Sequence, residues 1–317
     1  MTRLNMLDLR AMAQRSFGGL LAVLMLLMLV GCPSVMTTNQ VEQVNKFAKT
    51  AEAYGPLPGD VLRTYADQKW ALDLVDMSTL EPDDAAELFK LSSESRQEMY
   101  QEAAQVDQSL AVLNTYASLL KTLTASDYTE ATGKEAQRFG EAIDTGVVKY
   151  NELSGSSVSS FGSIAASAVQ AIGGMYIRHK QGKALKAAVT NAEKSVNQLL
   201  KESMELMEPY GADDKHFVAL RSSLQTSLIP LTDSWNSAGE PVPLDVVEWF
   251  REQYLSSYQG SKLAKLSYDA AKKYQAAHEK LVEAVEVKEN LVEIIGSVEA
   301  FASDVEAALA LKKQMEK

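Results

Sequence analysis

Cysteine, histidine, proline and glycine are all scarce in this sequence. One Cys and three His among 317 residues exclude a disulfide-stabilised scaffold, a zinc-finger array and most metal sites built from His and Cys. Seventeen Gly and eight Pro are few for a sandwich or barrel with many turns. Positive charge is also in deficit: the formal net charge of −11 argues against a nucleic-acid-binding protein. What remains is an acidic chain that we expect to be all-α.

Catalytic and metal-binding motifs are missing as well. His179, His216 and His278 are far apart, and none has a second His or Cys three or four residues away. There is no HExxH motif, no Gly-rich phosphate loop before a helix and no GxSxG. Carboxylate pairs such as Asp83 and Asp84 are expected on the solvated faces of a chain with 42 acidic residues. We therefore predict that the protein is not an enzyme and has no cofactor and no metal ion.

Three stretches of the chain repeat apolar residues at alternating steps of three and four. Such spacing places the residues on one seam of a helix, which has to be buried against a partner helix. Three seams in one chain predict an elongated antiparallel helical bundle with coiled-coil-like seams. No segment alternates with a period of two, so no sheet is predicted. The seams consist of Met99, Ala103, Val106, Leu110, Leu113, Ala117 and Leu120; of Leu185, Val189, Ala192, Val196, Leu199, Ser203 and Leu206; and of Leu291, Ile294, Val298, Phe301, Val305 and Ala308.

Proline and glycine predict where the helices end. Residues 55–59, with two Gly and two Pro, separate a short first helix at about 38–54 from the rest. Pro82 begins the helix of the first seam, because proline is tolerated in a first turn. Residues 208–211 end the helix of the second seam, and residues 236–243 form the clearest break in the second half.

The amino terminus has the layout of an export signal. Arg3, Arg10 and Arg15 precede an uncharged, Leu-rich run over residues 17–30. A basic segment followed by an apolar run of this length is typical of a secretory signal, and it is too short to span a bilayer comfortably as a mature helix.

The end of this run, Leu29-Val30-Gly31-Cys32, resembles the lipobox of bacterial lipoproteins. The resemblance implies attachment of a diacylglyceryl group to the Cys32 sulfur, cleavage between Gly31 and Cys32, and acylation of the new amino group with a fatty acid such as palmitate. Two or three acyl chains at one point give stable membrane anchoring. The alternatives are an ordinary secretory signal with a chance cysteine, or an uncleaved anchor. In Gram-negative lipoproteins, Pro33 in place of Asp after the cysteine implies sorting to the outer membrane.

These features predict three segments: a signal peptide (1–31), a lipidated tether with a short first helix (32–60), and an elongated helical bundle (61–317). We expect a lipid-anchored protein of the bacterial envelope, on the periplasmic face of the outer membrane. It would act as a structural or protein-interaction module, with the membrane and unidentified envelope proteins as its partners.

Residues 154–177 contain no charge and are rich in Gly, Ser and Ala. One interpretation is a central bundle helix whose small residues allow close packing. Another is a membrane-interacting segment, since the layout resembles that of α-helical pore-forming toxins; the chain would then be a membrane-active protein that inserts through this segment. A third is the interface of a homo-oligomer. The candidate residues for membrane or oligomer contact are Phe161, Ala165, Ala166 and Ile172.

Aromatic residues cluster after the break at residues 236–243. A candidate contact patch consists of Trp249, Phe250, Tyr254, Tyr258, Tyr268 and Tyr274 with Glu248 and Arg251, because Trp, Tyr and Arg are common anchors of protein interfaces. Within it, the candidate partner-contact residues are Trp249, Phe250, Arg251 and Tyr254. The alternative is packing of a helix end beneath the loop.

Overall fold

The computed structural model describes residues 38–124, 181–287 and 291–316. All of them belong to one compact unit, Thr38–Lys317. This part of the chain consists of helices and short turns, without a strand, so the predicted all-α helical bundle is confirmed. The helices are α2 (Thr38–Tyr54), α3 (Leu57–Met77), α4 (Pro82–Thr124), α7 (Gln181–Gly211), α8 (Lys215–Ala238), α9 (Leu244–Val287) and α10 (Leu291–Met315).

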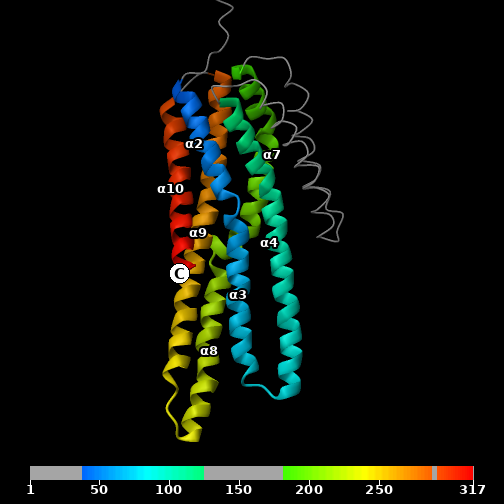
Figure 1. Ribbon diagram of the computed structural model, residues 1–317, viewed down its shortest axis with the longest axis vertical. Helices are drawn as coiled ribbons and strands as arrows, with labels where there is room; N and C mark the ends of the chain where they lie inside the picture. Colours follow the sequence, from blue (N-terminus) through cyan, green and yellow to red (C-terminus); the bar gives the residue numbers. More distant parts are fainter. Residues whose placement is uncertain (1–37, 125–180, 288–290, 317) are drawn as a thin grey trace, which may run out of the picture. The chain divides into compact units, whose positions relative to one another are not determined.

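Two long helices, α4 and α9, run through the whole unit, while the other helices cover one half each (Figure 1). The pair α2 and α3 follow one another along one side, and α7 and α8 do the same along another. Helix α10 packs on α9 and α2. We call the half that contains α2, α7 and α10 the proximal half, and the half that contains α3 and α8 the distal half. Of the described helices, the proximal half therefore has five in cross-section and the distal half has four.

Polar contacts fix the direction of neighbouring helices. Asn45 Nδ2 of α2 donates a hydrogen bond to Thr124 Oγ1, 3.0 Å away at the end of α4, so α4 runs back to the start of α2. Further along, Arg63 of α3 pairs with Asp107 of α4. These pairs show that α4 is antiparallel to both α2 and α3.

The three predicted seams form much of the core. Nearly all of their described members are buried, from Ala103 and Leu120 on α4 to Phe301 on α10, each of which is 0% exposed. Met99 and Leu206, at the ends of two seams, are half-buried. Rings from three helices fill the proximal core: Tyr274 of α9 lies 5.1 Å from Phe47 of α2 and 4.8 Å from Phe301 of α10, centroid to centroid. The seams thus pack against one another, as a bundle requires.

The predicted helix ends agree with the structure. Helix α2 covers residues 38–54, α4 begins at Pro82, and α7 ends at Gly211. The break predicted at residues 236–243 contains the turn between α8 and α9, residues 239–243, where Gly239 adopts a φ of 74°. This left-handed conformation, which glycine adopts without strain, lets the Gly239 and Glu240 amides donate to carbonyl groups of the last turn of α8. The segment boundary predicted at residues 60 and 61 lies within α3, and α2 packs against α4 and α10 as part of the bundle.

Candidate interaction surface

The candidate partner-contact residues predicted from the sequence lie in the first third of α9, in the distal half. Phe250 is buried at 7% exposure, and the ring of the half-buried Trp249 meets it edge to face with centroids 5.1 Å apart. Arg251 is exposed and Tyr254 is half-buried. The four residues therefore do not form one exposed patch. Phe250 belongs to the core, while Arg251 and one side of Tyr254 face solvent.

A polar and aromatic cluster joins α8 to α9 beside this patch. The Tyr254 and Tyr258 rings meet edge to face at 5.2 Å, and their hydroxyl oxygens are 3.3 Å apart. The hydrogen bond to Tyr258 raises the pKa of Tyr254. The Arg221 guanidinium of α8 lies 4.4 Å from the centre of the Tyr258 ring and donates to Asp214 at 2.6 Å. Gln225 of α8 donates to the Tyr254 hydroxyl at 3.4 Å, so both tyrosines are held against α8.

The outer side of α9 in the distal half carries large apolar side chains that none of the described helices covers. Leu244 is 71% exposed, Tyr258 is 50% exposed, and Val247 and Leu255 are each 47% exposed. With Arg251 between them, these residues follow one another at steps of three and four, so they lie on one face of the helix. On the neighbouring helix α8, Val218 and Ile229 are exposed by 51% and 58%.

A second exposed apolar area surrounds the turn between α3 and α4. It includes Leu74, Leu80, Phe89 and Leu91, of which Leu91 is 55% exposed. The ring of Phe89 packs edge to face on Trp70, with centroids 5.3 Å apart. The ten large hydrophobic side chains that are exposed in the described part of the chain thus all belong to the distal half or its turns.

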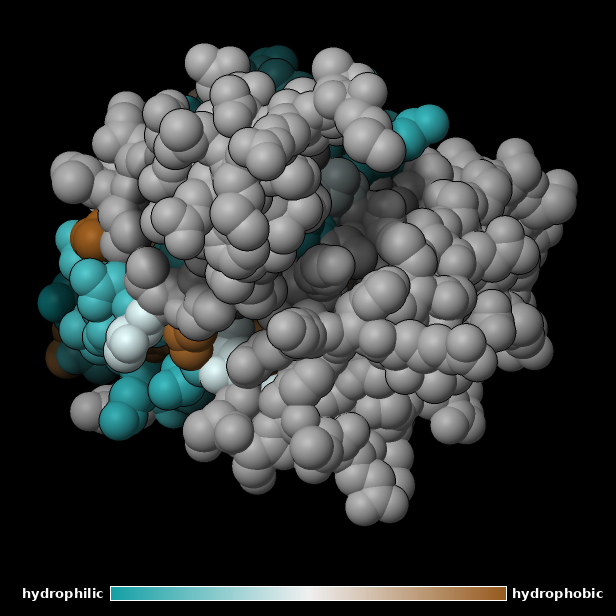
Figure 2. All heavy atoms as spheres, turned by 90° about the horizontal axis from the view of Figure 1, so that it is seen from above, coloured by the Kyte–Doolittle hydropathy of each residue, from teal (hydrophilic) through white to brown (hydrophobic). Residues whose placement is uncertain are grey.

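Figure 2 views the unit along the helix axes from the start of α2, the end opposite the distal half. The described side chains visible from this side are mainly hydrophilic, with a few hydrophobic ones among them (Figure 2). Contiguous exposed apolar area is typical of interaction sites. The distal half is therefore the better candidate for contact with another molecule.

Acidic side chains border the apolar face of α9. Asp245, Glu248 and Glu252 are exposed and follow one another at steps of three and four, so they form a row beside Leu244 and Leu255. Between residues 244 and 258 the only basic residue is Arg251. This part of α9 thus combines an apolar stripe with an acidic edge.

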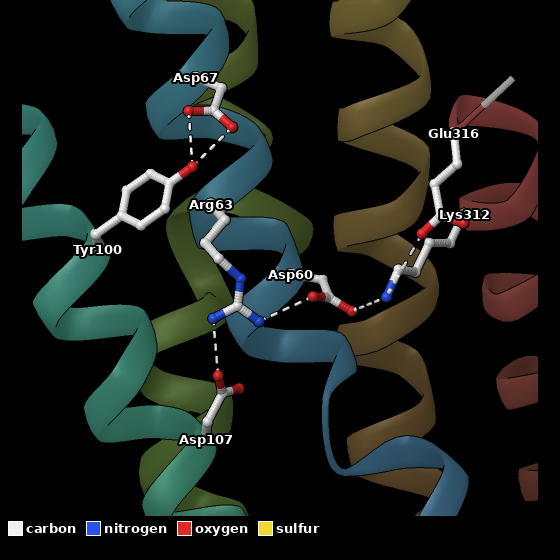
Figure 3. Close-up of polar contacts among 7 residues, drawn as sticks. All are labelled: Asp60, Arg63, Asp67, Tyr100, Asp107, Lys312 and Glu316. Atoms are coloured by element: carbon white, nitrogen blue, oxygen red, sulfur yellow. Dashed lines mark hydrogen bonds and ion pairs between the residues drawn. The ribbon is translucent and has the colours of Figure 1, made fainter.

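A charged network ties together the middle of the bundle (Figure 3). Arg63 of α3 donates to Asp107 of α4 at 2.7 Å and to Asp60 at 2.8 Å. Asp60 also accepts from Lys312, at 2.6 Å, near the end of α10. Burial raises the pKa of Asp107 in spite of the nearby Arg63 cation. The network holds the start of α3 between α4 and α10 at the junction of the two halves.

A cavity of about 200 Å³ lies between α4 and α7. Burial raises the pKa of Glu102, whose side chain is part of its wall. The Glu202 carboxylate, also in the wall, accepts a hydrogen bond from Gln198 at 2.6 Å. The lining is completed by Gln105, Val106, Ser109, Leu110, Leu199, Ser203 and Leu206.

Several predicted site residues lie outside the described part of the chain. They are the cleavage and lipidation residues Gly31 and Cys32, and the candidate membrane or oligomer residues Phe161, Ala165, Ala166 and Ile172. Among the helices that the structure does describe, none is both long and apolar enough to cross a bilayer. Within the same residues, no three His, Cys, Asp or Glu side chains are grouped as they would be to hold a metal ion.

The α8 residues of the α8–α9 cluster, Arg221 and Gln225, were not predicted as site residues. Tyr254 and Tyr258 of α9 both belong to the predicted aromatic patch, and they are one helical step of four apart. Arg221 lies on a different helix, and nothing in the local sequence links it to Tyr258.

The chain was compared with protein-family models, with curated proteins and with solved structures, and none of them matches it. The contacts, exposure and charge of its own residues therefore carry the functional proposal.

Proposed function

We propose that this chain is a lipid-anchored helical protein of the bacterial envelope whose distal half binds another envelope protein. The lipobox-like sequence ending at Cys32 supports the anchor. The observation that carries the interaction is the concentration of exposed large apolar side chains in the distal half. Burial of apolar surface is the main driving force of protein association, and exposed patches of this kind mark binding surfaces.

The covalent chain limits where the anchor can be. Only residues 33–37 separate Cys32 from the start of α2 at Thr38, and an extended chain of this length spans at most about 20 Å. The start of α2 lies beside the end of α4, where Asn45 bonds Thr124. The 43 residues of α4 rise about 65 Å from there to the α3–α4 turn. A lipid at Cys32 would thus hold the proximal end near the membrane and leave the apolar surface at the far end of α4.

The anchor is tested by labelling cells with radioactive palmitate and comparing the wild type with Cys32→Ser. We expect the wild type to incorporate label and fractionate with membranes, because the acyl chains provide the attachment. The variant should lose the label, and either leave the membranes or remain at the unprocessed mass of 34.6 kDa. A Cys32→Ser protein that is labelled and fractionates like the wild type would contradict the lipid anchor.

The interaction is tested by photo-crosslinking in living cells. A photoreactive phenylalanine analogue replaces Leu255 in the distal half or, as the control, the exposed Lys201 on α7 in the proximal half. We expect a discrete crosslinked product from position 255 and none from position 201. Equal products at both positions, or a product at position 201 alone, would contradict a distal interaction surface.

A further inference from the structure

The two halves of α9 differ in what covers them. In the proximal half, α10 packs along α9, and the ion pair between Lys273 and Asp304, at 2.6 Å, sets its register. Because the two helices are antiparallel, α10 reaches its last turn near residue 262 of α9, at about 1.5 Å of rise per residue. Figure 1 shows α10 ending about halfway along the unit. Beyond this point, none of the described helices lies beside residues 244–258 of α9 as a fifth helix.

The uncovered stretch has the pattern of a helix-packing seam. We call Leu244, Val247, Glu248, Arg251, Glu252, Leu255 and Tyr258 the open α9 face. With Arg251 counted between Val247 and Leu255, its apolar members follow the steps of three and four that the buried seams of α4 and α7 show. In the proximal half, residues at such spacing on α9 are covered by a helix. The natural partner of the open face is therefore also a helix.

Charge decides what kind of helix fits. Asp245, Glu248 and Glu252 line one edge of the stripe, all three are exposed, and none has an ion-pair partner among the described residues. Arg251 is the only base on this stretch. A second copy of the chain would bring like charges together, and an anionic lipid surface would be repelled in the same way. A helix with one apolar side flanked by Lys or Arg would match both the stripe and its acidic edge.

We propose that the open α9 face docks a cationic amphipathic helix of the partner protein, in line with α10. The proposal rests on the proposed function, in which the distal half binds an envelope protein, and it specifies the chemistry of that partner. The neighbouring Val218 and Ile229 of α8 widen the apolar contact. Tyr254 and Tyr258 lie between this contact area and α8, since Arg221 and Gln225 of α8 hold the two tyrosine side chains in place.

A designed peptide tests the proposal without knowledge of the partner. The probe is a labelled peptide of about 16 Leu and Lys residues, with Leu at steps of three and four, which as a helix is about as long as the open face. Two comparison peptides have the same composition in an order without helical period, or Glu in place of Lys. Binding is measured by fluorescence anisotropy on residues 33–317, which retain the whole compact unit Thr38–Lys317.

Two pairs of matched variants locate the binding. Leu255→Asp changes the open face, while Leu91→Asp places the same charge at an equally exposed position on α4. The double variant Glu248→Lys/Glu252→Lys reverses the acidic edge, while Glu87→Lys/Glu94→Lys reverses two exposed acids on α4. All these side chains are exposed, so the variants should fold, and thermal melting followed by circular dichroism checks this.

We expect the Leu/Lys helix to bind, and both changes on the open face to weaken binding by about tenfold or more. The α4 variants should stay within about twofold of the wild type, and added salt should weaken binding less in the Glu248→Lys/Glu252→Lys variant. The proposal is overturned if the helix does not bind, if the peptide without helical period binds equally well, or if the α4 variants lose as much affinity.

Two other occupants are tested with the same variants. If the chain dimerises in sedimentation experiments and Leu255→Asp dissociates the dimer, the face binds a second copy, and the proposal is wrong. If vesicles of phosphatidylglycerol bind through Leu255, the occupant is a lipid surface, and the proposal is equally wrong. Failure of peptide binding while crosslinking at position 255 persists in cells would remove only this inference, whereas loss of the crosslink would remove the proposed function.

Discussion

The Nε2 atom of His278 on α9 lies 2.9 Å from the hydroxyl oxygen of Tyr116 on α4, and both side chains are fully buried. The two residues are 162 positions apart in the sequence. Burial lowers the pKa of His278 to about 3, because an imidazolium in the core would lose its hydration. His278 is therefore a neutral, hydrogen-bonded residue of the core that joins the two longest of the described helices.

This pair predicts acid sensitivity of the fold. The unfolded chain binds a proton at His278 below about pH 6.5, whereas the folded chain does so only near pH 3, so stability falls as the pH decreases through this window. The slope is at most about 1.4 kcal/mol per pH unit from this one group. His278→Gln keeps a hydrogen-bonding group but does not titrate, so urea unfolding at a series of pH values should show a shallower loss for the variant. Equal slopes for the two proteins would mean that His278 is charged or exposed.

Two glycines predict opposite effects of the same substitution. A Cβ atom on Gly211, at the end of α7, would lie 2.5 Å from the Ala264 carbonyl oxygen and 2.8 Å from Tyr268 Cβ. Because backbone cannot yield easily, Gly211→Ala should lower the free energy of unfolding by about 1–3 kcal/mol. A Cβ on Gly296 of α10 meets nothing within 4 Å, so Gly296→Ala should raise it by up to about 1 kcal/mol through helix propensity. Denaturant titration of the two variants measures both free energies of unfolding. If the two free energies change by similar amounts in the same direction, the close approach of α7 and α9 is contradicted.

From the charged network at the junction, we predict that loss of Arg63 lowers the free energy of unfolding more than loss of an exposed cation does. Arg63→Met leaves Asp107 and Asp60 without the guanidinium, and burial already raises the pKa of Asp107. We expect a loss of about 1–2 kcal/mol, since all three groups retain some contact with solvent. The control is Lys201→Met, because Lys201 lies 3.6 Å from Glu205 and both side chains are more than 60% exposed. That change should stay within about 0.5 kcal/mol of the wild type, and a similar loss in both variants would contradict a structural role for the network.

Substitution by alanine should distinguish a core residue of α9 from a surface residue of the same helix. Phe250 is 7% exposed and Leu255 is 47% exposed, although both are large apolar residues on the same stretch of helix. Phe250→Ala should lower the free energy of unfolding by about 3 kcal/mol or more, because it leaves a cavity. Leu255→Ala should change it by less than about 0.5 kcal/mol. Thermal melts of both variants test this, and a large loss for Leu255→Ala would show that the open α9 face is covered within the protein itself.

Much of the local structure followed from the sequence. Helical spacing of apolar residues and the positions of Pro and Gly are local signals, and they predicted α2, the start of α4 and the turn between α8 and α9 correctly. The same signals drew attention to Trp249, Phe250, Arg251 and Tyr254. They did not distinguish the buried Phe250 from its exposed neighbours, because burial depends on which other helix lies beside it.

The sequence by itself thus determined which residues form helices and which faces of those helices are apolar, since both properties arise within a few turns of one chain segment. Only the tertiary structure decided which helix covers which face. It brought Asp60 to Lys312 across 252 residues, and it ended α10 where α9 continues. Leu244 and the buried Leu263 have the same chemistry on the same helix, yet only Leu244 is open to solvent, because no helix in the described part of the chain extends along its face.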